Sequence, residues 1–224
     1  MKKEYDNNRN NNLTELVMII DRSGSMSGME DSTIKGYNNL LKEQKAIKGE
    51  VLVSTVLFDH EIQVLHDRIP IQKVNYLTAR DYQTRGCTAL LDAVGGAIRH
   101  IVKIHRYTNP KYRPGKTLFV IITDGMENSS RFYTYPQVKQ MIDREKNKYG
   151  WEFLFLGANI DAARDAGRMG IDADFAVDYC PDARGTQLNY EVLSRAVGSV
   201  RMCEAPLSKG WKKRIDADYK KRGK

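Results

Sequence analysis

Long apolar runs and cysteines are scarce in this 224-residue sequence. No stretch approaches the roughly 18 consecutive apolar residues that a membrane-spanning helix needs. The polar start, MKKEYDNNRNNN, lacks the apolar segment of a secretory signal. The three cysteines, Cys87, Cys180 and Cys203, form an odd, sparse set without metal-type spacing. We therefore expect a cytoplasmic protein with reduced thiols.

Motifs for zinc binding and for common catalytic chemistry are also missing. The four histidines show no i, i+4 pairing suited to zinc. Gly115-Lys116-Thr117 resembles the end of a P-loop, but it precedes an apolar run, whereas a P-loop follows a strand. Ser32-Thr33-Ile34-Lys35 matches a penicillin-binding pattern, but no Lys-Thr-Gly partner accompanies it. The sequence therefore predicts no catalytic residues.

Positive charge is concentrated at the carboxyl end of the chain. The formal net charge is +8, and the segment from Lys209 onward holds eight Lys or Arg against Asp216 and Asp218. In this segment Trp211, Ile215 and Tyr219 are spaced four apart, as on one face of a helix. Such a helix either docks on the body, which we favour, or binds nucleic acid or an acidic protein surface.

Apolar periodicity predicts an alternation of strands and helices. Continuous apolar or alternating runs predict strands at 13–20, 51–58, 61–66, 118–123, 151–156 and 175–177. Helical spacing predicts helices at 29–47, 88–105, 135–148, 161–169 and 187–202, with a short helix near 74–77 inside a loop. Two residues, 59 and 60, link the second and third strands, so these strands are expected to form a hairpin.

The fold class follows from this alternation. We predict an α/β protein with a doubly wound, mostly parallel six-stranded sheet, one antiparallel edge strand and helices on both faces. The expected organisation is a disordered Asn-rich lead-in at 1–12, one domain at 13–203 and a basic tail at 204–224. The basic loop 105–116 precedes a central strand, so it is expected at the opposite end of the sheet from the strand ends discussed next.

Oxygen-bearing side chains follow the two most apolar strands. Asp21 ends the run LVMII and is followed by Ser23 and Ser25, and Asp124 ends the run LFVIIT. In a doubly wound sheet the carboxyl ends of adjacent central strands flank one cleft. Two carboxylates there repel each other unless a cation lies between them. With Thr88 as a further neutral ligand, the all-oxygen set suits Mg²⁺ or Mn²⁺ better than Zn²⁺.

These motifs carry a family resemblance. Asp21-Arg22-Ser23-Gly24-Ser25, then Thr88, then Asp124-Gly125 resemble the metal-ion-dependent adhesion site of von Willebrand factor A domains, over roughly 13–203. The resemblance implies that Ser23 and Ser25 bind Mg²⁺ directly, that Asp21 and Asp124 act largely through water, and that Thr88 is a ligand in one state. It further implies an intracellular bacterial or phage-type adaptor, in which the cation accepts an acidic side chain from a partner protein.

Several alternatives stay open. The set Asp21, Ser23 and Ser25 could instead form a simple turn and helix cap. A nucleic-acid-associated protein would use the basic tail. An aspartyl-phosphate enzyme of the haloacid dehalogenase type would need a second acid at the position of Ser23. Side chains expected near the site, as candidates for ligand selectivity, are Met126, Glu127, Asn128, Asn159 and Asp161. Arg22, beside the first proposed ligand, is expected either to attract an acidic partner or to be solvated.

Overall fold

A single six-stranded sheet organises the molecule, in a computed structural model that describes residues 9–202 and 206–222. The strands are β1 (Asn10–Asp21), β2 (Glu50–Phe58), β3 (Ile62–Pro70), β4 (Pro114–Thr123), β5 (Glu152–Gly157) and β6 (Ala176–Asp178), in the order β3-β2-β1-β4-β5-β6. All neighbouring pairs are parallel except β2 and β3. The predicted fold class is therefore confirmed.

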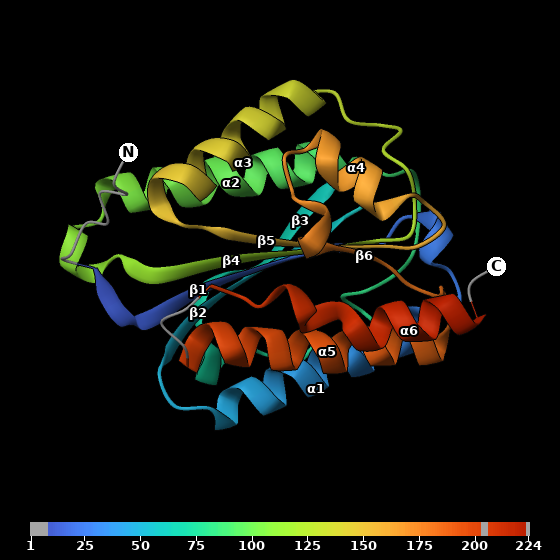
Figure 1. The fold of residues 1–224 in the computed structure, drawn as a ribbon, viewed down its shortest axis with the longest axis horizontal. Helices are drawn as coiled ribbons and strands as arrows, with labels where there is room; N and C mark the ends of the chain where they lie inside the picture. Colours follow the sequence, from blue (N-terminus) through green and yellow to red (C-terminus); the bar gives the residue numbers. More distant parts are fainter. Residues whose placement is uncertain (1–8, 203–205, 223–224) are drawn as a thin grey trace.

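Helices cover both faces of this sheet (Figure 1). One layer holds α2 (Leu90–Tyr107), α3 (Tyr135–Tyr149) and α4 (Ala162–Arg168), and the other holds α1 (Glu30–Ala46), α5 (Ala183–Met202) and α6 (Lys213–Arg222). Among the described residues, none of the helices combines the length and the apolar character needed to cross a membrane.

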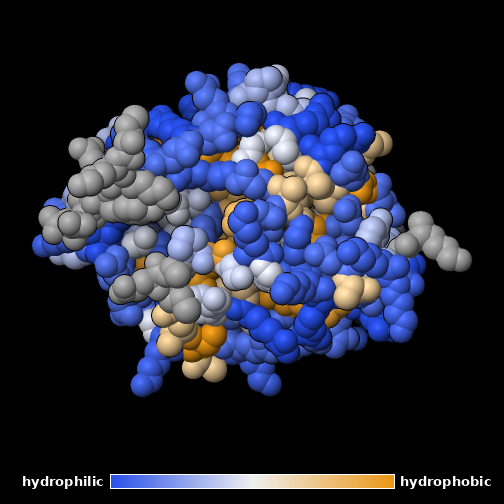
Figure 2. Space-filling view, in the orientation of Figure 1, coloured by the Kyte–Doolittle hydropathy of each residue, from blue (hydrophilic) through white to orange (hydrophobic). Residues whose placement is uncertain are grey.

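Burial on both faces explains the continuous apolar runs of the central strands. Leu16 and Ile20 of β1 pack in the cluster beneath α1 and α5, whereas Val17 and Ile19 pack beneath α2 and α3. Successive side chains of a strand point to opposite faces, so every position must be apolar when both faces are covered. The face of the molecule in Figure 2 is largely hydrophilic by contrast, with apolar residues in smaller areas between hydrophilic ones.

The arrangement of β1 and β4 positions the candidate site. The chain leaves β1 toward β2 on one side and later returns to β4 on the other, so the winding direction changes between these two strands. Ile20 pairs with Ile122, so Asp21 and Thr123 end the strands at the same level and Asp124 follows directly. Ligand sites of doubly wound sheets lie at this kind of position.

Several predicted boundaries differ from the structure. β1 already begins at Asn10, whose N–H donates to Arg113 O at 3.0 Å, so residues 10–12 are not part of a disordered lead-in; residues 1–8 lie outside the described part. β4 correspondingly begins at Pro114. The side chains of Asn11 and Asn12 are exposed, and backbone pairing between strands does not require apolar side chains. In the same way α5 begins at Ala183 rather than 187, because Asp182 accepts the N–H of Gly185 and caps the extra turn.

Two local predictions are wrong. The segment 74–77 is extended, and the short helix is a 3-10 turn at Ile71–Lys73 instead. Val74 and Leu77 are buried, but Leu77 is held by the side chain of Asn38, which bonds both its N–H and its C=O. The link between β2 and β3 is three residues long, and it is closed by a hydrogen bond from Asp59 N to Glu61 O.

Candidate metal centre

Three loops meet at the carboxyl edge of β1 and β4. The first follows β1, the second runs into α2, and the third follows β4. The first two are joined by backbone hydrogen bonds from Gly24 N to Gly86 O at 3.0 Å and from Arg85 N to Arg22 O at 2.8 Å. The third is joined to the second where Asn128 N donates to Thr88 O at 3.1 Å. The predicted site residues are therefore brought to one place.

Asp21 lies at the bottom of the site and is fully buried. Its Oδ1 accepts the N–H of Ser23 at 2.7 Å, and its Oδ2 accepts the hydroxyl of Thr123 at 2.5 Å. Burial, with a smaller contribution from the charge of Asp124, raises the pKa of Asp21 to about 6, although the hydrogen bonds from Thr123 and Ser23 lower it. A buried carboxylate beside another therefore needs either a proton or a cation.

Ser23, Ser25 and Asp124 form a chain of oxygens above Asp21. The hydroxyl of Ser25 donates to Asp124 Oδ1 at 2.5 Å, and the Ser23 and Ser25 hydroxyls are 3.0 Å apart. Asp124 Oδ2 is buried and accepts no hydrogen bond from the described residues. Burial also raises the pKa of Asp124. An unpartnered buried carboxylate oxygen is costly, and a bound cation would satisfy it.

Thr88 completes the set from the start of α2. A Cβ atom added at Gly125 would lie 3.1 Å from both the Ser25 Oγ and the Thr88 Oγ1, and 4.0 Å from the Ser23 Oγ. The three hydroxyls therefore surround the position next to Gly125. Asn128 fixes the Thr88 backbone, because its side-chain oxygen accepts the Thr88 N–H at 2.9 Å.

The donor set fits a hard divalent cation. The five side chains Asp21, Ser23, Ser25, Thr88 and Asp124 offer two carboxylates and three hydroxyls, with no His or Cys among them. Oxygen-only sets of this kind suit Mg²⁺ or Mn²⁺. The crowding around Gly125 and the unpartnered oxygen of Asp124 both agree with a space shaped for an ion.

Sequence reasoning missed several residues that support this set. Tyr82 is buried and its hydroxyl donates to Asp21 O at 2.5 Å, which holds the end of β1. Asp92 is buried and accepts the N–H groups of Arg131, Phe132 and Tyr133, so it fixes the loop after β4. No periodicity or motif marks these residues, because their partners are distant in the sequence.

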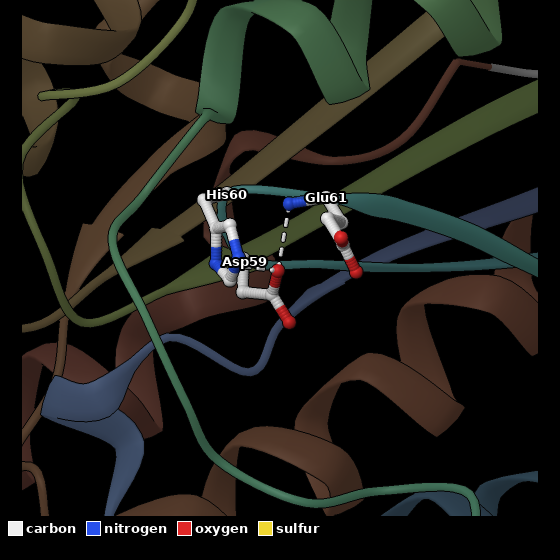
Figure 3. A group of neighbouring side chains, drawn as sticks. All are labelled: Asp59, His60 and Glu61. Carbon is white, nitrogen blue, oxygen red and sulfur yellow. Dashed lines mark hydrogen bonds and ion pairs between the residues drawn. The ribbon is translucent and has the colours of Figure 1, made fainter.

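Arg22 has a different role from the one expected. It is 5% exposed, so it is neither solvated nor displayed to an acidic partner. Its Nε donates to Asp59 Oδ2 at 2.8 Å, and Arg85 Nε donates to the same oxygen at 3.0 Å. Figure 3 shows Asp59 with its neighbours His60 and Glu61. The Glu61 N–H donates to the other carboxylate oxygen of Asp59, Oδ1.

The group of Asp59, His60 and Glu61 has ligand atoms within 4.8 Å of one another, but its charges are already balanced. Arg22 and Arg85 contact Asp59, and Arg85 also pairs with Glu61 at 2.7 Å. A cation at this group would lie beside two guanidinium groups, which repel it. The group therefore serves as an ion-pair cluster rather than a second metal site.

The loop after β4 presents fewer side chains than expected. Glu127 points inward, where its carboxylate accepts the N–H groups of Leu91 and Ser130 and so caps α2. Asn128 is engaged with Thr88 as described above, whereas Met126 is 61% exposed. Glu127 and the side-chain oxygen of Asn128 are therefore engaged within the protein, whereas Met126 is exposed.

A groove of about 580 Å³ opens beside Met126. Its other walls come from the loop after β5, α4, the loop after β6 and α6. Of the residues expected here, Asn159 lines the groove, and Asp161 also caps α4 by accepting the Arg164 N–H at 2.9 Å. The groove lies next to the candidate metal centre because Met126 follows Asp124 by two residues.

The aromatic stripe of the tail is docked on the body. Ile215 is buried, and Trp211 donates its Nε1–H to Asp174 O at 3.0 Å. Basic groups of the segment are engaged as well, with Lys209 pairing with Asp174 and Arg222 with Asp182. The packing favours the docked interpretation over a helix displayed for nucleic acid.

Comparison with solved structures identifies the architecture. The chain is similar to a von Willebrand factor type A protein from Catenulispora acidiphila (TM-score 0.56, 13% identity), over 83% of this chain and 43% of that one. It is similar to proximal thread matrix protein 1 of the mussel byssus, with a zinc-occupied MIDAS motif (TM-score 0.58, 11% identity), over 83% of this chain and 46% of that one. It also matches manganese-loaded TRAP of Plasmodium vivax (TM-score 0.55, 16% identity), over 80% and 72%.

These likenesses show the fold, which is that of von Willebrand factor A domains. The chain spans less than half the length of the Catenulispora and mussel proteins. No protein-family model matches the sequence, and no curated protein matches it.

Proposed function

We propose that this protein binds a divalent cation, Mg²⁺ or Mn²⁺, through Asp21, Ser23, Ser25, Thr88 and Asp124. The observation that carries the proposal is the convergence of these five side chains from three loops, with a buried carboxylate oxygen of Asp124 left unpartnered among the described residues. The metal-loaded states named for two structural neighbours support it. As the resemblance implies, the two serines would bind directly and the aspartates largely through water.

The bound cation would serve recognition of another protein. With few direct anionic ligands it stays electrophilic, and Mg²⁺ keeps exchangeable waters, one of which can give way to a carboxylate. We propose that an acidic side chain of a partner protein takes this position, and that the chain acts as a cytoplasmic adaptor. The groove beside Met126 supports this reading, because it offers further contact area next to the cation.

A catalytic role is not proposed. Ser23 stands where an aspartyl-phosphate enzyme needs its second acid, and its hydroxyl contacts Ser25 rather than a general base. The buried tyrosines near the site are poor bases and acids at neutral pH, because burial raises the pKa of Tyr82 and Tyr179 well above the ordinary range. Both hydroxyl groups stay protonated, and that of Tyr82 donates to Asp21 O.

The proposal is tested by affinity capture of partner proteins in Mg²⁺ and in EDTA. We expect partners that elute with EDTA from the wild-type protein and that are not retained by Asp21→Ala. Asp67→Ala is the matched control, because this aspartate is exposed and pairs only with His100 in the described part of the chain. Partner binding that survives both EDTA and Asp21→Ala would contradict the proposal.

A further inference from the structure

Asp59 occupies an unusual position for a carboxylate outside the ligand set. It follows β2 directly, is fully buried and receives both guanidinium groups on one oxygen, Oδ2. Its Oδ1 accepts the Glu61 N–H at 2.7 Å. Although burial opposes ionisation, the hydrogen bonds from Glu61 and Arg85 and the two positive charges lower the pKa of Asp59, so the carboxylate is anionic.

Each of the two arginines belongs to a loop that carries proposed metal ligands. Arg22 lies between Asp21 and Ser23, and Arg85 precedes Thr88 by three residues. One oxygen atom therefore connects the serine loop to the threonine loop. Removing the carboxylate would release both connections at once.

The backbone around Asp59 reinforces the same connection. Arg22 N donates to Phe58 O at 2.7 Å, which attaches the serine loop to the end of β2. Ala89 N donates to Asp59 O at 2.9 Å, which attaches the residue after Thr88 to the same point. Both loops are thus attached to the adjacent residues Phe58 and Asp59, neither of which is a proposed ligand.

We infer that Asp59 is a positioning residue, which holds the Ser23 and Ser25 hydroxyls at the correct separation from the Thr88 hydroxyl and thereby sets the affinity for the divalent cation. The inference rests on the proposed metal site. Mg²⁺ demands near-ideal octahedral geometry, so a change in the separation of its ligands lowers its affinity strongly. Mn²⁺, used as a second probe, reports on the same ligands.

The test compares Asp59→Asn with a matched control, Glu15→Gln. Glu15 is also fully buried and paired with an arginine, Arg68, at 2.8 Å. It lies six residues before Asp21 on the same strand, roughly 20 Å away along β1. Asp59→Asn removes the charge that pairs with Arg22 and Arg85, and Glu15→Gln removes the charge that pairs with Arg68 and His105, so both variants should lose thermal stability. In titration calorimetry with Mg²⁺ and with Mn²⁺, the dissociation constant should rise about tenfold or more for Asp59→Asn and stay unchanged for Glu15→Gln.

Arg85→Gln separates positioning from simple electrostatics. Its side chain is about half exposed, so the variant is expected to fold even where Asp59→Asn does not. Removing a cation near the site would tighten metal binding if charge alone mattered. Positioning predicts the opposite, a several-fold weaker affinity, and no large further loss when Asp59→Asn is added, because both changes break one connection.

The outcomes distinguish this inference from the function on which it rests. A wild-type protein that binds neither Mg²⁺ nor Mn²⁺ would overturn the proposed metal site itself. A wild-type protein that binds, with Arg85→Gln binding equally or more tightly, would overturn the positioning role alone. Equal weakening by Glu15→Gln and Asp59→Asn would also overturn it, because the effect would then follow stability rather than loop position.

Discussion

At the scale of single residues, the candidate site depends on small and uncharged residues as much as on charged ones. Gly125 leaves the space that Ser25, Thr88 and Ser23 surround. Asp21 and Asp124 supply negative charge, but both are buried, so their environment decides whether they hold a proton or compensate a cation. A glycine and three hydroxyl residues thus shape the candidate site, and the two carboxylates supply its negative charge.

Gly125→Ala should therefore weaken cation binding without unfolding the protein. The added methyl group would lie 3.1 Å from the Ser25 and Thr88 oxygens, so these hydroxyls must move by a few tenths of an ångström. We expect about tenfold weaker Mg²⁺ binding in a calorimetric titration. Gly96→Ala is the control, because its methyl group meets nothing within 4 Å. Equal affinities for Gly125→Ala and the wild type would show that the ion binds elsewhere.

At the scale of elements, loops are fixed by buried carboxylates, and the tail is fixed by packing. Asp92 and Glu127 fasten the loop after β4 onto the start of α2. Helix α6 places Ile215 in the core cluster beneath the sheet, beside α5. Its charged residues consequently face outward or pair with neighbours, as Arg222 does with Asp182 and Asp218.

Ile215→Ala should destabilise the whole domain and not only the tail. The side chain is 1% exposed, and truncating a buried isoleucine to alanine costs about 2–5 kcal/mol through lost burial and the cavity left behind. Urea denaturation followed by circular dichroism measures the difference. Met202→Ala, at 63% exposure on α5, is the control and should change stability little. A negligible effect of Ile215→Ala would mean that α6 is not docked in solution.

At the scale of the whole molecule, the candidate site is expected to make stability depend on pH and on the proposed cation. In the unfolded chain Asp21 has its ordinary pKa of 3.8, and burial in the folded protein raises this pKa to about 6. The folded state therefore holds the proton more tightly than the unfolded state. The stability from this protonated group is present below pH 3.8 and is lost as the pH rises through about 6.

Comparing the wild type with Asp21→Asn isolates the contribution of Asp21 to the pH dependence of stability. In EDTA, the unfolding free energy of the wild type relative to the variant should fall between about pH 4 and pH 6, by on the order of 3 kcal/mol at most. Above pH 6, added Mg²⁺ should restore stability to the wild type only, since a cation compensates the carboxylate that the variant lacks. Parallel pH profiles for the two proteins, with and without Mg²⁺, would contradict this linkage.

Local patterns in the sequence were sufficient for the fold class and for the proposed ligands. The runs ending at Asp21 and Asp124 predict buried central strands because both faces of the sheet are covered, and each run marks where its strand stops. Helical spacing likewise predicts α1, α2 and α3 to within a few residues. The prediction of a short helix at 74–77 was wrong, because apolar spacing does not distinguish a helix from an extended segment held by a side chain such as that of Asn38.

The support of the site was decided by the tertiary structure alone. Asp59 reaches Arg22 over 37 positions and Arg85 over 26, and Asp92 reaches the loop after β4 over about 40. Such pairs leave no local signal, because a buried carboxylate and an exposed one look alike in a sequence. The sequence by itself therefore predicted which oxygen-bearing side chains meet at the carboxyl edge of β1 and β4. Only the packing of the loops decided which carboxylates form ion pairs within the protein and which remain available to a ligand.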